Sequence, residues 1–564
     1  MKIDEIDRLS LSHLQHNIHA LQQVNPALAG RIALPVLDNH LEMRDNCILL
    51  KQGQSRYCLN LPLEELLRTI NKPEGRLFLF GAGSPDLVKH LLKQSSVSRL
   101  VVWDRDPYLL RILLMHTDFS AEIRSGRLQL ALGIDIIDFI DGDDYEKIAH
   151  PVLQQVYFAE FALLQNGLSD RRVMISPETL YSFEAFSFFR NQGYSVYSLD
   201  LKRISLDEIQ YAILKFKPEL LFVINYISGL AELAHQMQVP VACWEIDPFV
   251  DHLKKPTAST DGCFIFCYRP AIVQEFQHAG FKHVYYLPLG ADTNLRHPVA
   301  LKPEEKSKYQ APVSFVGSSM VEQALEYRRL LFAQYAQYQA TQQKRNQFEA
   351  DLEEILQIQR DHFGSFLIQE LASHYFYEFI QYSRKNNLPD PIMLISEIAA
   401  SEKRLNYLRI VARFGLKLWG DRGWKVLESC GARYMGPAGR NQEINKIYSG
   451  TQINLDINRL YQSDIVPIRI FDVLACGGFL LAEYSEELER LFDLEKELVC
   501  YRNDDELVRK VQYFLKHPVE ARRFAEQGRR AVYEKHAFAL RMKKILECVQ
   551  SPKTGYRQAK AALS

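Results

Sequence analysis

A loop rich in acidic residues follows a predicted buried strand at residues 239–244. Residues 244–252 carry three carboxylates and one imidazole within nine positions. Carboxylate and imidazole groups are the usual general bases that take a proton from a reacting hydroxyl. This pattern predicts a catalytic base, with Glu245, Asp247 and His252 as the candidates. In the structural alternative, Asp247 caps a helix and His252 is solvated.

A second set of polar residues lies on a short predicted helix at residues 468–475, whose first turn holds Arg469 and Asp472. The double glycine at 477–478 ends this helix, because glycine readily adopts the left-handed conformation found just past helix ends. The apolar run 479–482 is typical of a strand buried on both faces. Ligands bind beside the carboxyl ends of such strands in doubly wound α/β sheets.

The stretch 466–507 resembles the C-terminal half of the CgeB-like glycosyltransferases, a group with GT-B architecture named after a spore-maturation protein. The resemblance implies that the carboxylate at position 472 binds the ribose hydroxyls of a nucleotide donor. Asp472 stands where the family usually has Glu, so it keeps the charge but has a shorter reach. The segment 517–530 and His536 also resemble the closing helices of the family. The matching residues are Arg469, Phe471, Asp472, Leu474, Ala475, Cys476, Gly477, Phe479, Leu480, Glu497, Leu498, Val499, Tyr501, Asp505, Glu506 and Leu507.

Three further positions are candidates for binding the donor. Gly317 follows a predicted strand at 313–316, and backbone N–H groups of such a glycine turn can hold a diphosphate. Asn458 and Arg459 stand where the family has a loop near the donor. Arg459 or Arg469 could offset diphosphate charge, as guanidinium groups do well. A surface or helix-packing role for either arginine remains the alternative.

Regular alternation of strands and helices predicts a parallel sheet in each of two Rossmann-like halves. We place the acceptor-side half at residues 151–310 and the donor-side half at 311–550. A helical stretch at 322–409 interrupts the donor-side half and lacks a sustained heptad repeat. Its periodicity predicts amphipathic helices packed on their own domain. A homodimer or partner contact through this insertion is the alternative.

An additional Rossmann-like module is predicted at residues 71–150. Gly81 and Gly83 form a turn after a buried strand, and Asp104 lies 23 residues beyond Gly81. That spacing suits an acidic residue that reaches a ribose held over the turn. The module resembles the nucleoside-binding half of class I methyltransferases and the Rossmann domain of flagellin-glycosyltransferase-like proteins. Methyltransferases usually have an acidic residue where this chain has Phe80, so binding of S-adenosylmethionine or a nucleoside is the minor interpretation beside a structural or recognition role.

Composition narrows the class of protein. The chain has 564 residues and a formal net charge of -1, which gives no electrostatic case for nucleic acid or an anionic membrane as the main partner. No apolar run approaches the ~18 residues needed to span a bilayer, and the charged N-terminus is unlike a signal peptide. The nine scattered cysteines indicate reduced thiols and a cytoplasmic protein. Their spacing predicts no metal site.

The predicted fold is α/β, with a GT-B type pair of Rossmann-like domains, a further Rossmann-like domain before them and a helical insertion. Residues 1–70 form a lead-in, and 551–564 form a flexible tail. The resemblance implies a metal-independent glycosyltransferase that uses a nucleotide-diphosphate sugar and modifies a large acceptor, such as flagellin, another protein or a surface glycan. The alternatives are a methyltransferase fused to a degenerate glycosyltransferase and a non-catalytic recognition protein that binds sugar nucleotides.

Overall fold

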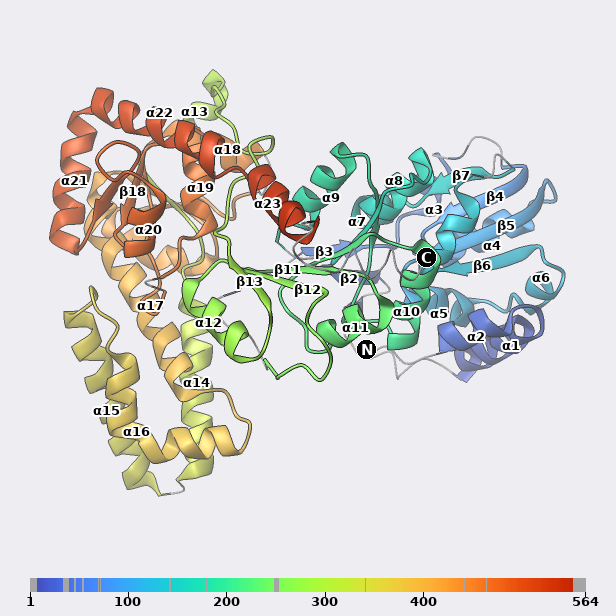
Figure 1. Cartoon of the computed structure of the whole chain (residues 1–564), viewed down its shortest axis with the longest axis horizontal. Coiled ribbons are helices and arrows are strands. Elements are labelled where there is room, and N and C mark those ends of the chain that lie inside the picture. Colours follow the sequence, from blue (N-terminus) through green and yellow to red (C-terminus); the bar gives the residue numbers. More distant parts are fainter. Residues whose placement is uncertain are drawn as a thin grey trace. The chain divides into compact units, whose positions relative to one another are not determined.

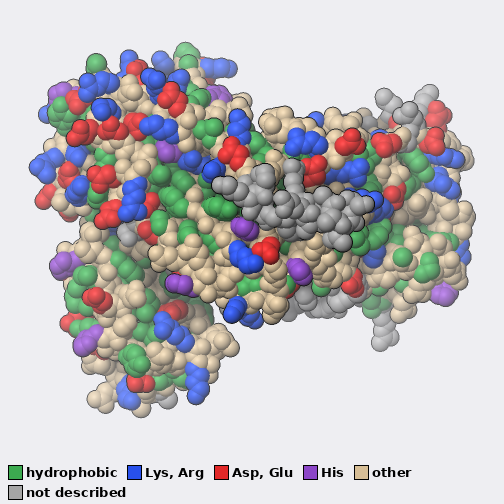
Figure 2. All heavy atoms as spheres, viewed as in Figure 1, with side chains coloured by type: hydrophobic (Ala, Val, Ile, Leu, Met, Phe, Trp, Pro, Cys, Tyr) green, Lys and Arg blue, Asp and Glu red, His purple; other side chains and the backbone are tan. Residues whose placement is uncertain are grey.

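The computed structural model describes residues 8–33, 40–44, 47–52, 55–68, 70, 73–141, 144–177, 180–247, 253–339, 341–439, 442–462 and 464–550. The chain divides into two compact units. The first comprises residues 1–266, 275–285 and 545–564, and the second comprises 267–274 and 286–544. Within the described ranges, no helix combines the length and apolar character needed to cross a membrane. Lys and Arg are interspersed with Asp and Glu on the face shown in Figure 2, in keeping with the small net charge.

The first unit begins with helices and a three-stranded antiparallel sheet of order β1-β2-β3. A disulfide joins Cys47 and Cys58, whose Cα atoms lie 6.2 Å apart on these adjacent strands. The prediction that all nine cysteines are reduced is therefore wrong for this pair, because strand pairing brings the two thiols within bonding reach. The elements are α1 (Arg8–Val24), α2 (Pro26–Ala33), β1 (Leu41–Arg44), β2 (Cys47–Gln52), β3 (Ser55–Cys58) and α3 (Leu63–Leu67).

A parallel sheet of order β6-β5-β4-β7 follows. Its strands are apolar runs, and the last five residues of β5 are buried, as expected where helices cover both faces. Helix α5 begins at Asp106, whose carboxylate accepts the N–H of Tyr108 at 2.8 Å. The elements are β4 (Gly75–Phe80), α4 (Pro85–Lys93), β5 (Val97–Asp104), α5 (Pro107–His116), α6 (Ser120–Arg124), β6 (Leu128–Leu132), the 3-10 helix η2 (Gly133–Phe139) and β7 (Glu146–Ala149).

A second, six-stranded sheet has the order β13-β12-β11-β10-β8-β9. Every residue of β10, β11 and β12 is buried, and the pairs from β9 to β11 are parallel. The elements are α7 (Leu153–Val156), α8 (Phe158–Asn166), β8 (Arg172–Ile175), α9 (Ser182–Asn191), β9 (Ser195–Ser198), α10 (Leu206–Phe216), β10 (Leu220–Ile224), α11 (Leu230–Met237), β11 (Val241–Glu245), β12 (Cys263–Cys267), α12 (Pro270–His278) and β13 (His283–Tyr286).

The second unit is built on a parallel sheet of order β16-β15-β14-β17-β18-β19. From the central β14 the chain first adds β15 and β16 on one side and then β17, β18 and β19 on the other, so the order reverses between β14 and β17. The elements are α13 (Pro303–Tyr309), β14 (Ala311–Val316), η3 (Ala412–Phe414), β15 (Leu416–Trp419), η4 (Arg422–Cys430), β16 (Arg433–Tyr434), α18 (Gln442–Gly450), β17 (Thr451–Leu455), α19 (Ile468–Ala475), β18 (Leu480–Glu483), α20 (Glu486–Leu491), β19 (Val499–Tyr501), α21 (Asp504–Lys516), α22 (Pro518–Lys535) and α23 (Phe538–Gln550).

Four α-helices of the described chain stand between β14 and β15 in the sequence: α14 (Val321–Tyr338), α15 (Gln342–Asp361), α16 (Ile368–Lys385) and α17 (Pro391–Val411). They share a hydrophobic core of their own, to which α17 contributes Leu394 and Ile395. Farther along the same helix, Leu408 and Val411 belong to the core of the sheet. Helix α17 therefore joins the insertion to the sheet, as Figure 1 shows.

The predicted fold class is confirmed. Two six-stranded sheets provide the pair of Rossmann-like domains, the four-stranded parallel sheet precedes them, and the insertion is helical. The domain boundaries given above stay predictions.

Candidate functional site

Polar side chains gather at the carboxyl ends of the strands in the second unit. Residues 317–319 follow β14, Asp421 follows β15, Asp456 follows β17 and Glu483 ends β18. Because these strands are parallel and adjacent, their carboxyl ends lie along one edge of the sheet. The strand order reverses between β14 and β17, and ligands of open α/β sheets bind outside the carboxyl ends at such a reversal.

Arg469 lies on the first turn of α19 and reaches this reversal point. Its guanidinium donates to the buried Asp456 carboxylate at 2.5 Å and lies 4.6 Å from the ring centre of Phe315. A Cβ atom at Gly317 would stand only 3.0 Å from the same guanidinium. The glycine therefore allows a cationic side chain to pack directly against the turn after β14, where an anion could meet it.

A second guanidinium, that of Arg404 on α17, reaches the same turn. The residue is only 6% exposed. It donates to the carbonyl oxygens of Ser318 at 2.8 Å and Ile457 at 3.4 Å. Within the described ranges it forms no ion pair, and its Nε has no hydrogen-bond partner. Burial and the neighbouring Arg469 and Arg459 guanidiniums lower its pKa, but a guanidinium stays charged at neutral pH.

The turn after β14 is held by Asp421, the N-cap of η4. Its carboxylate accepts hydrogen bonds from the Ser318 hydroxyl at 2.7 Å, from the N–H and hydroxyl of Ser319, and from the N–H of Gly423 at 3.0 Å. Burial by itself would raise the pKa of Asp421. The hydrogen bonds to its carboxylate outweigh that effect, so the pKa is lowered. Asp421 therefore fixes the shape of the turn with hydroxyl and N–H donors.

Asp472 lies three residues after Arg469 on α19, so the two side chains share one face of the helix. The residue is 8% exposed, and the Arg296 Nε donates to its carboxylate at 3.1 Å. Burial raises the pKa of Asp472, and the Arg296 guanidinium opposes that shift. The structure thus places Asp472 near Arg469, another donor-site candidate. Its carboxylate is paired with Arg296, a residue that the sequence pattern did not indicate.

Asn458 and Arg459, the two other predicted donor-site residues, follow β17. The N–H of Asn458 donates to the Glu483 carboxylate at 3.0 Å, and Lys403 of α17 donates to the other oxygen at 2.5 Å. Burial raises the pKa of Glu483, against the effect of the Lys403 ammonium. Arg459 donates to Glu397 of α17 at 2.8 Å. Arg459 is therefore linked directly to α17, and Asn458 is linked to α17 through the Glu483 side chain.

Residues 400–547 match the protein family described as Glycosyl transferase-like. This glycosyltransferase-like stretch contains Arg404, Arg469 and Asp472, and it follows Gly317 in the chain. The match covers the stretch 466–507 that resembles glycosyltransferases and supports that expectation for residues 400–547, whereas the finer assignment to the CgeB-like group stays a prediction. No curated protein sequence matches the chain.

Three solved structures resemble the chain at low identity. A glycosyltransferase from Rickettsia africae is 10% identical with a TM-score of 0.41, and the match covers 67% of this chain and 98% of that one. HepE from Anabaena, solved with UDP and glucose, is 11% identical with a TM-score of 0.39, covering 68% and 99%. Sucrose-phosphate synthase from Thermosynechococcus elongatus is 10% identical with a TM-score of 0.38, covering 70% and 100%.

The predicted acceptor-side candidates lie in the first unit, at the carboxyl ends of β10 and β11. Glu245 is buried and accepts the N–H of Tyr226 at 2.8 Å. Asp247 is exposed and accepts the Asn225 side-chain amide at 2.6 Å. His252 lies outside the described residues. The structure therefore places Glu245 and Asp247 at the carboxyl end of β11, and of these two only Asp247 is open to solvent.

The glycine turn of the N-terminal module is filled by the protein itself. A Cβ atom at Gly81 would stand 2.6 Å from a methyl carbon of Leu153, and one at Gly83 would stand 3.2 Å from the His150 ring. Asp104 is fully buried and accepts the N–H groups of Ala82 and Asp106 at 2.8 and 2.9 Å. Binding of S-adenosylmethionine or a nucleoside over Gly81, Gly83 and Asp104 does not fit this arrangement, because the chain occupies the space that the ligand would need.

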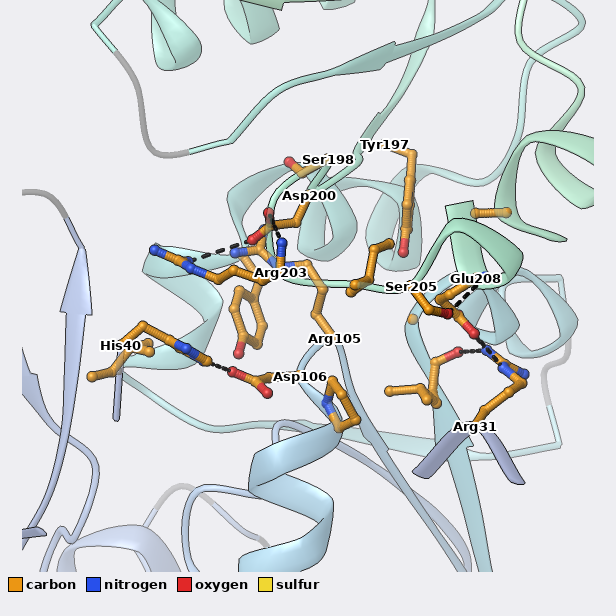
Figure 3. A pocket seen from close by; sticks show the side chains of 17 residues that line it. Arg31, His40, Arg105, Asp106, Tyr197, Ser198, Asp200, Arg203, Ser205 and Glu208 are labelled. Atoms are coloured by element: carbon orange, nitrogen blue, oxygen red, sulfur yellow. Dashed lines mark hydrogen bonds and ion pairs between the residues drawn. The ribbon is translucent and has the colours of Figure 1, made fainter. Parts of the chain in front are cut away.

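A cavity of about 50 Å³ lies in the first unit, at the carboxyl ends of β5, β6 and β9 (Figure 3). Its charged side chains are matched in pairs. Arg31 donates to Glu208 and to Asp135, each at 2.6 Å. Further pairs are Arg203 with Asp200 at 3.5 Å, Arg105 with Glu160 at 3.5 Å, and His40 with Asp106. Of these pairs, Arg31 with Glu208 and Arg105 with Glu160 connect the N-terminal module to the neighbouring sheet.

Residue patterns alone had missed Arg404, Arg296, Asp456 and Lys403. For Arg404 a signal was present, because it falls on the stripe Ala400, Arg404, Leu408 and Val411 of α17, at spacings that define one helix face. A cation on an otherwise apolar stripe is rarely buried without a reason. For Arg296 the chain gives no local signal, since its partner Asp472 is 176 residues away.

Proposed function

We propose that the protein is a glycosyltransferase that transfers a sugar from a nucleotide-diphosphate sugar to a large acceptor. The observation that carries the proposal is the contact between the Arg469 guanidinium and the glycine turn after β14, at the reversal point of a parallel sheet. The adjoining stretch 400–547 matches a glycosyl transferase-like family. A cation and the N–H groups of a glycine turn together suit a diphosphate.

Each donor-site residue then has a role. Arg469 and the turn at Gly317 hold the diphosphate, while Asp472, oriented by Arg296, binds the ribose hydroxyls. Asn458 and Arg459 border the site from the loop after β17. In this proposal protein groups neutralise the diphosphate, so the reaction needs no metal ion. Among the described residues there is no group of three or more His, Cys, Asp or Glu side chains that could hold one.

On the acceptor side, we assign the general base to Asp247. It stands two residues after the end of β11, is open to solvent and is oriented by the Asn225 amide. Glu245 suits this role less well, because it is buried and holds the N–H of Tyr226. A carboxylate that accepts the acceptor's proton is the base that an inverting transfer requires. The acceptor class stays as predicted, a protein such as flagellin or a surface glycan.

The test is a binding screen of the whole chain by thermal unfolding. UDP, GDP, TDP, UDP-glucose and S-adenosylmethionine are added in turn; the two uridine compounds come first because HepE binds UDP and UDP-glucose in its solved complexes. A ligand at 100 times its Kd adds about 2.7 kcal/mol to the free energy of unfolding. We expect one nucleoside diphosphate to stabilise the protein and Asp472→Ala to abolish that stabilisation.

The control is Asp493→Ala, which removes an exposed carboxylate from the same unit and should leave the ligand response unchanged. Stabilisation by S-adenosylmethionine alone would overturn the proposal and return the chemistry to the N-terminal module. Binding of a sugar nucleotide without transfer to any acceptor or to water would favour the second alternative, a recognition protein.

A further inference from the structure

Arg404 is a buried charge that forms no ion pair within the described ranges, although the Asp456 and Glu397 carboxylates lie near enough to favour its charged form. Its guanidinium lies under the turn after β14, where two carbonyl oxygens accept its hydrogen bonds and its Nε has no partner. Moving an ion of this kind out of water costs several kcal/mol, and backbone carbonyls offset only part of that penalty. A further anion at the turn would therefore stabilise the charged guanidinium.

The charged groups around Arg404 already have other partners. Arg469 is paired with Asp456, and Arg459 is paired with Glu397. The next carboxylate, that of Asp421, is satisfied by hydroxyl and N–H donors of the turn. One oxygen of the Asp456 carboxylate has no hydrogen-bond partner. The Asp456 charge favours the charged form of Arg404, but its ion pair is with Arg469.

The position of Arg404 matches that of Arg469. Both guanidiniums lie near the same Phe315 ring, 5.4 and 4.6 Å from its centre, and both contact residues of the turn at 317–318. They approach it from two different helices, α17 and α19. A diphosphate has two anionic groups, and two guanidiniums on one turn provide a cation for each.

Helix α17 holds Arg404 through both hydrophobic cores. The half that begins at Leu394 belongs to the core of the insertion, and the half that ends at Val411 belongs to the core of the sheet. Ser401, one turn before Arg404, donates its hydroxyl to the carbonyl of Ser319 at 3.1 Å. The insertion and the glycine turn are thus fixed to each other at the residue that carries the unpaired charge.

We propose that Arg404 anchors the diphosphate of the donor, so that the helical insertion is a working part of the donor site rather than an appended partner-binding module. This inference rests on the proposed function. It specifies the ligand further, because the site should prefer a diphosphate to a monophosphate and should depend little on Arg404 for the nucleoside part.

The experiment measures binding by calorimetry in magnesium-free buffer, with inorganic pyrophosphate as a probe that needs no base. The nucleoside diphosphate found in the screen and its parent nucleoside are measured beside it. The variants are Arg404→Gln, which removes the charge, and Arg404→Lys, which keeps it without the planar fork. Arg409→Gln removes an exposed arginine from the same helix and serves as the matched control.

We expect Arg404→Gln to weaken pyrophosphate and nucleoside diphosphate by on the order of tenfold or more, the effect of a lost charge-assisted hydrogen bond. Arg404→Lys should lie between this variant and the wild type. The nucleoside should bind all four proteins equally. That last result separates an anchoring role from a merely structural one, since a distorted turn would weaken the nucleoside as well.

Equal pyrophosphate affinity in the wild type and Arg404→Gln would overturn the inference while leaving the proposed function intact, provided that the wild type binds a nucleoside diphosphate. A parallel loss of nucleoside affinity would also overturn it, because Arg404 would then only shape the turn. If the wild type binds neither pyrophosphate nor any nucleoside diphosphate, the proposed function itself fails.

Discussion

Arginines gather at the carboxyl ends of parallel strands in both units, but they have different partners. Around the cavity of the first unit, Arg31 is paired with Glu208 and Arg203 with Asp200 (Figure 3). Arg31 is also paired with Asp135. At the glycine turn of the second unit, Arg404 has no carboxylate partner within the described ranges. At the sheet edge of the first unit, carboxylates of the protein pair with the arginines. At the sheet edge of the second unit, Arg404 forms no such pair within the described ranges.

This difference separates structural from functional charge. A buried cation that the protein itself neutralises contributes to holding elements together, and removing one partner leaves the other charge exposed to an apolar surrounding. A buried cation without a protein partner lowers stability until a ligand neutralises it. Mutation should therefore affect stability at the first edge and ligand affinity at the second.

The most direct attempt to break the comparison replaces each arginine by methionine. Arg31→Met should lower the free energy of unfolding by about 3–5 kcal/mol, because it leaves the buried Glu208 without its cation, while Asp135 keeps only Lys215 at 2.7 Å. Arg404→Met should change it by less than about 1 kcal/mol or raise it, because it removes an unpaired charge. Urea unfolding at pH 7 without ligand measures both. If Arg404→Met is as damaging as Arg31→Met, the two edges do not differ in kind.

A second prediction concerns how stability depends on pH, through the buried contact between His536 and Arg541 in the second unit. The His536 Nε2 faces the carbonyl of Leu491 at 3.0 Å, and its Nδ1 faces the Arg541 guanidinium at 2.8 Å. Neutral imidazole satisfies both contacts, since one nitrogen donates and the other accepts. Burial, reinforced by the Arg541 charge, lowers the pKa of His536 to about 4.

The folded-state pKa of His536 is depressed, so between pH 6.5 and 4 the unfolded chain binds more protons at this residue. Stability is present above pH 6.5 and is lost as the pH falls toward 4, by about 3 kcal/mol in total. The unfolding free energy should therefore depend less on pH across this range in His536→Gln than in the wild type. Nucleoside diphosphate affinity at pH 7 should stay as in the wild type, because this contact is structural; a loss of affinity would contradict that assignment.

Local sequence patterns predicted what depends on near neighbours. The helix at 468–475 begins and ends where the sequence indicated, and its Arg469 and Asp472 lie on one face. Apolar runs became buried strands, because only a sheet covered on both faces accommodates them. The α/β class followed from this alternation. These features depend on spacing within about one turn or one strand, which the sequence shows directly.

Contacts across long stretches of sequence were not predictable in this way. The partner of Asp472 is 176 residues away, and the residue that fills the space above Gly81 is Leu153. A glycine turn alone cannot distinguish a ligand from a returning segment of chain, since both need the space left by the missing side chain. Arg404 differs from these, because its place on a buried stripe of α17 was visible in the sequence, whereas the glycine turn that it contacts lies 86 residues away.

The two glycine turns offer the finest test of the comparison. Gly81 has a φ of +98° and closely contacts Leu153, so Gly81→Ala should lower the unfolding free energy by about 1–3 kcal/mol. At Gly317 a new methyl would meet only the end of the Arg469 side chain at 3.0 Å and the edge of the Phe315 ring. Gly317→Ala should therefore change stability by less than about 1 kcal/mol yet weaken pyrophosphate severalfold, since the guanidinium must move off the turn. Urea unfolding and calorimetry on the same two proteins decide it: a shared response would mean that both turns merely pack, whereas opposite responses would place the ligand over the second turn alone.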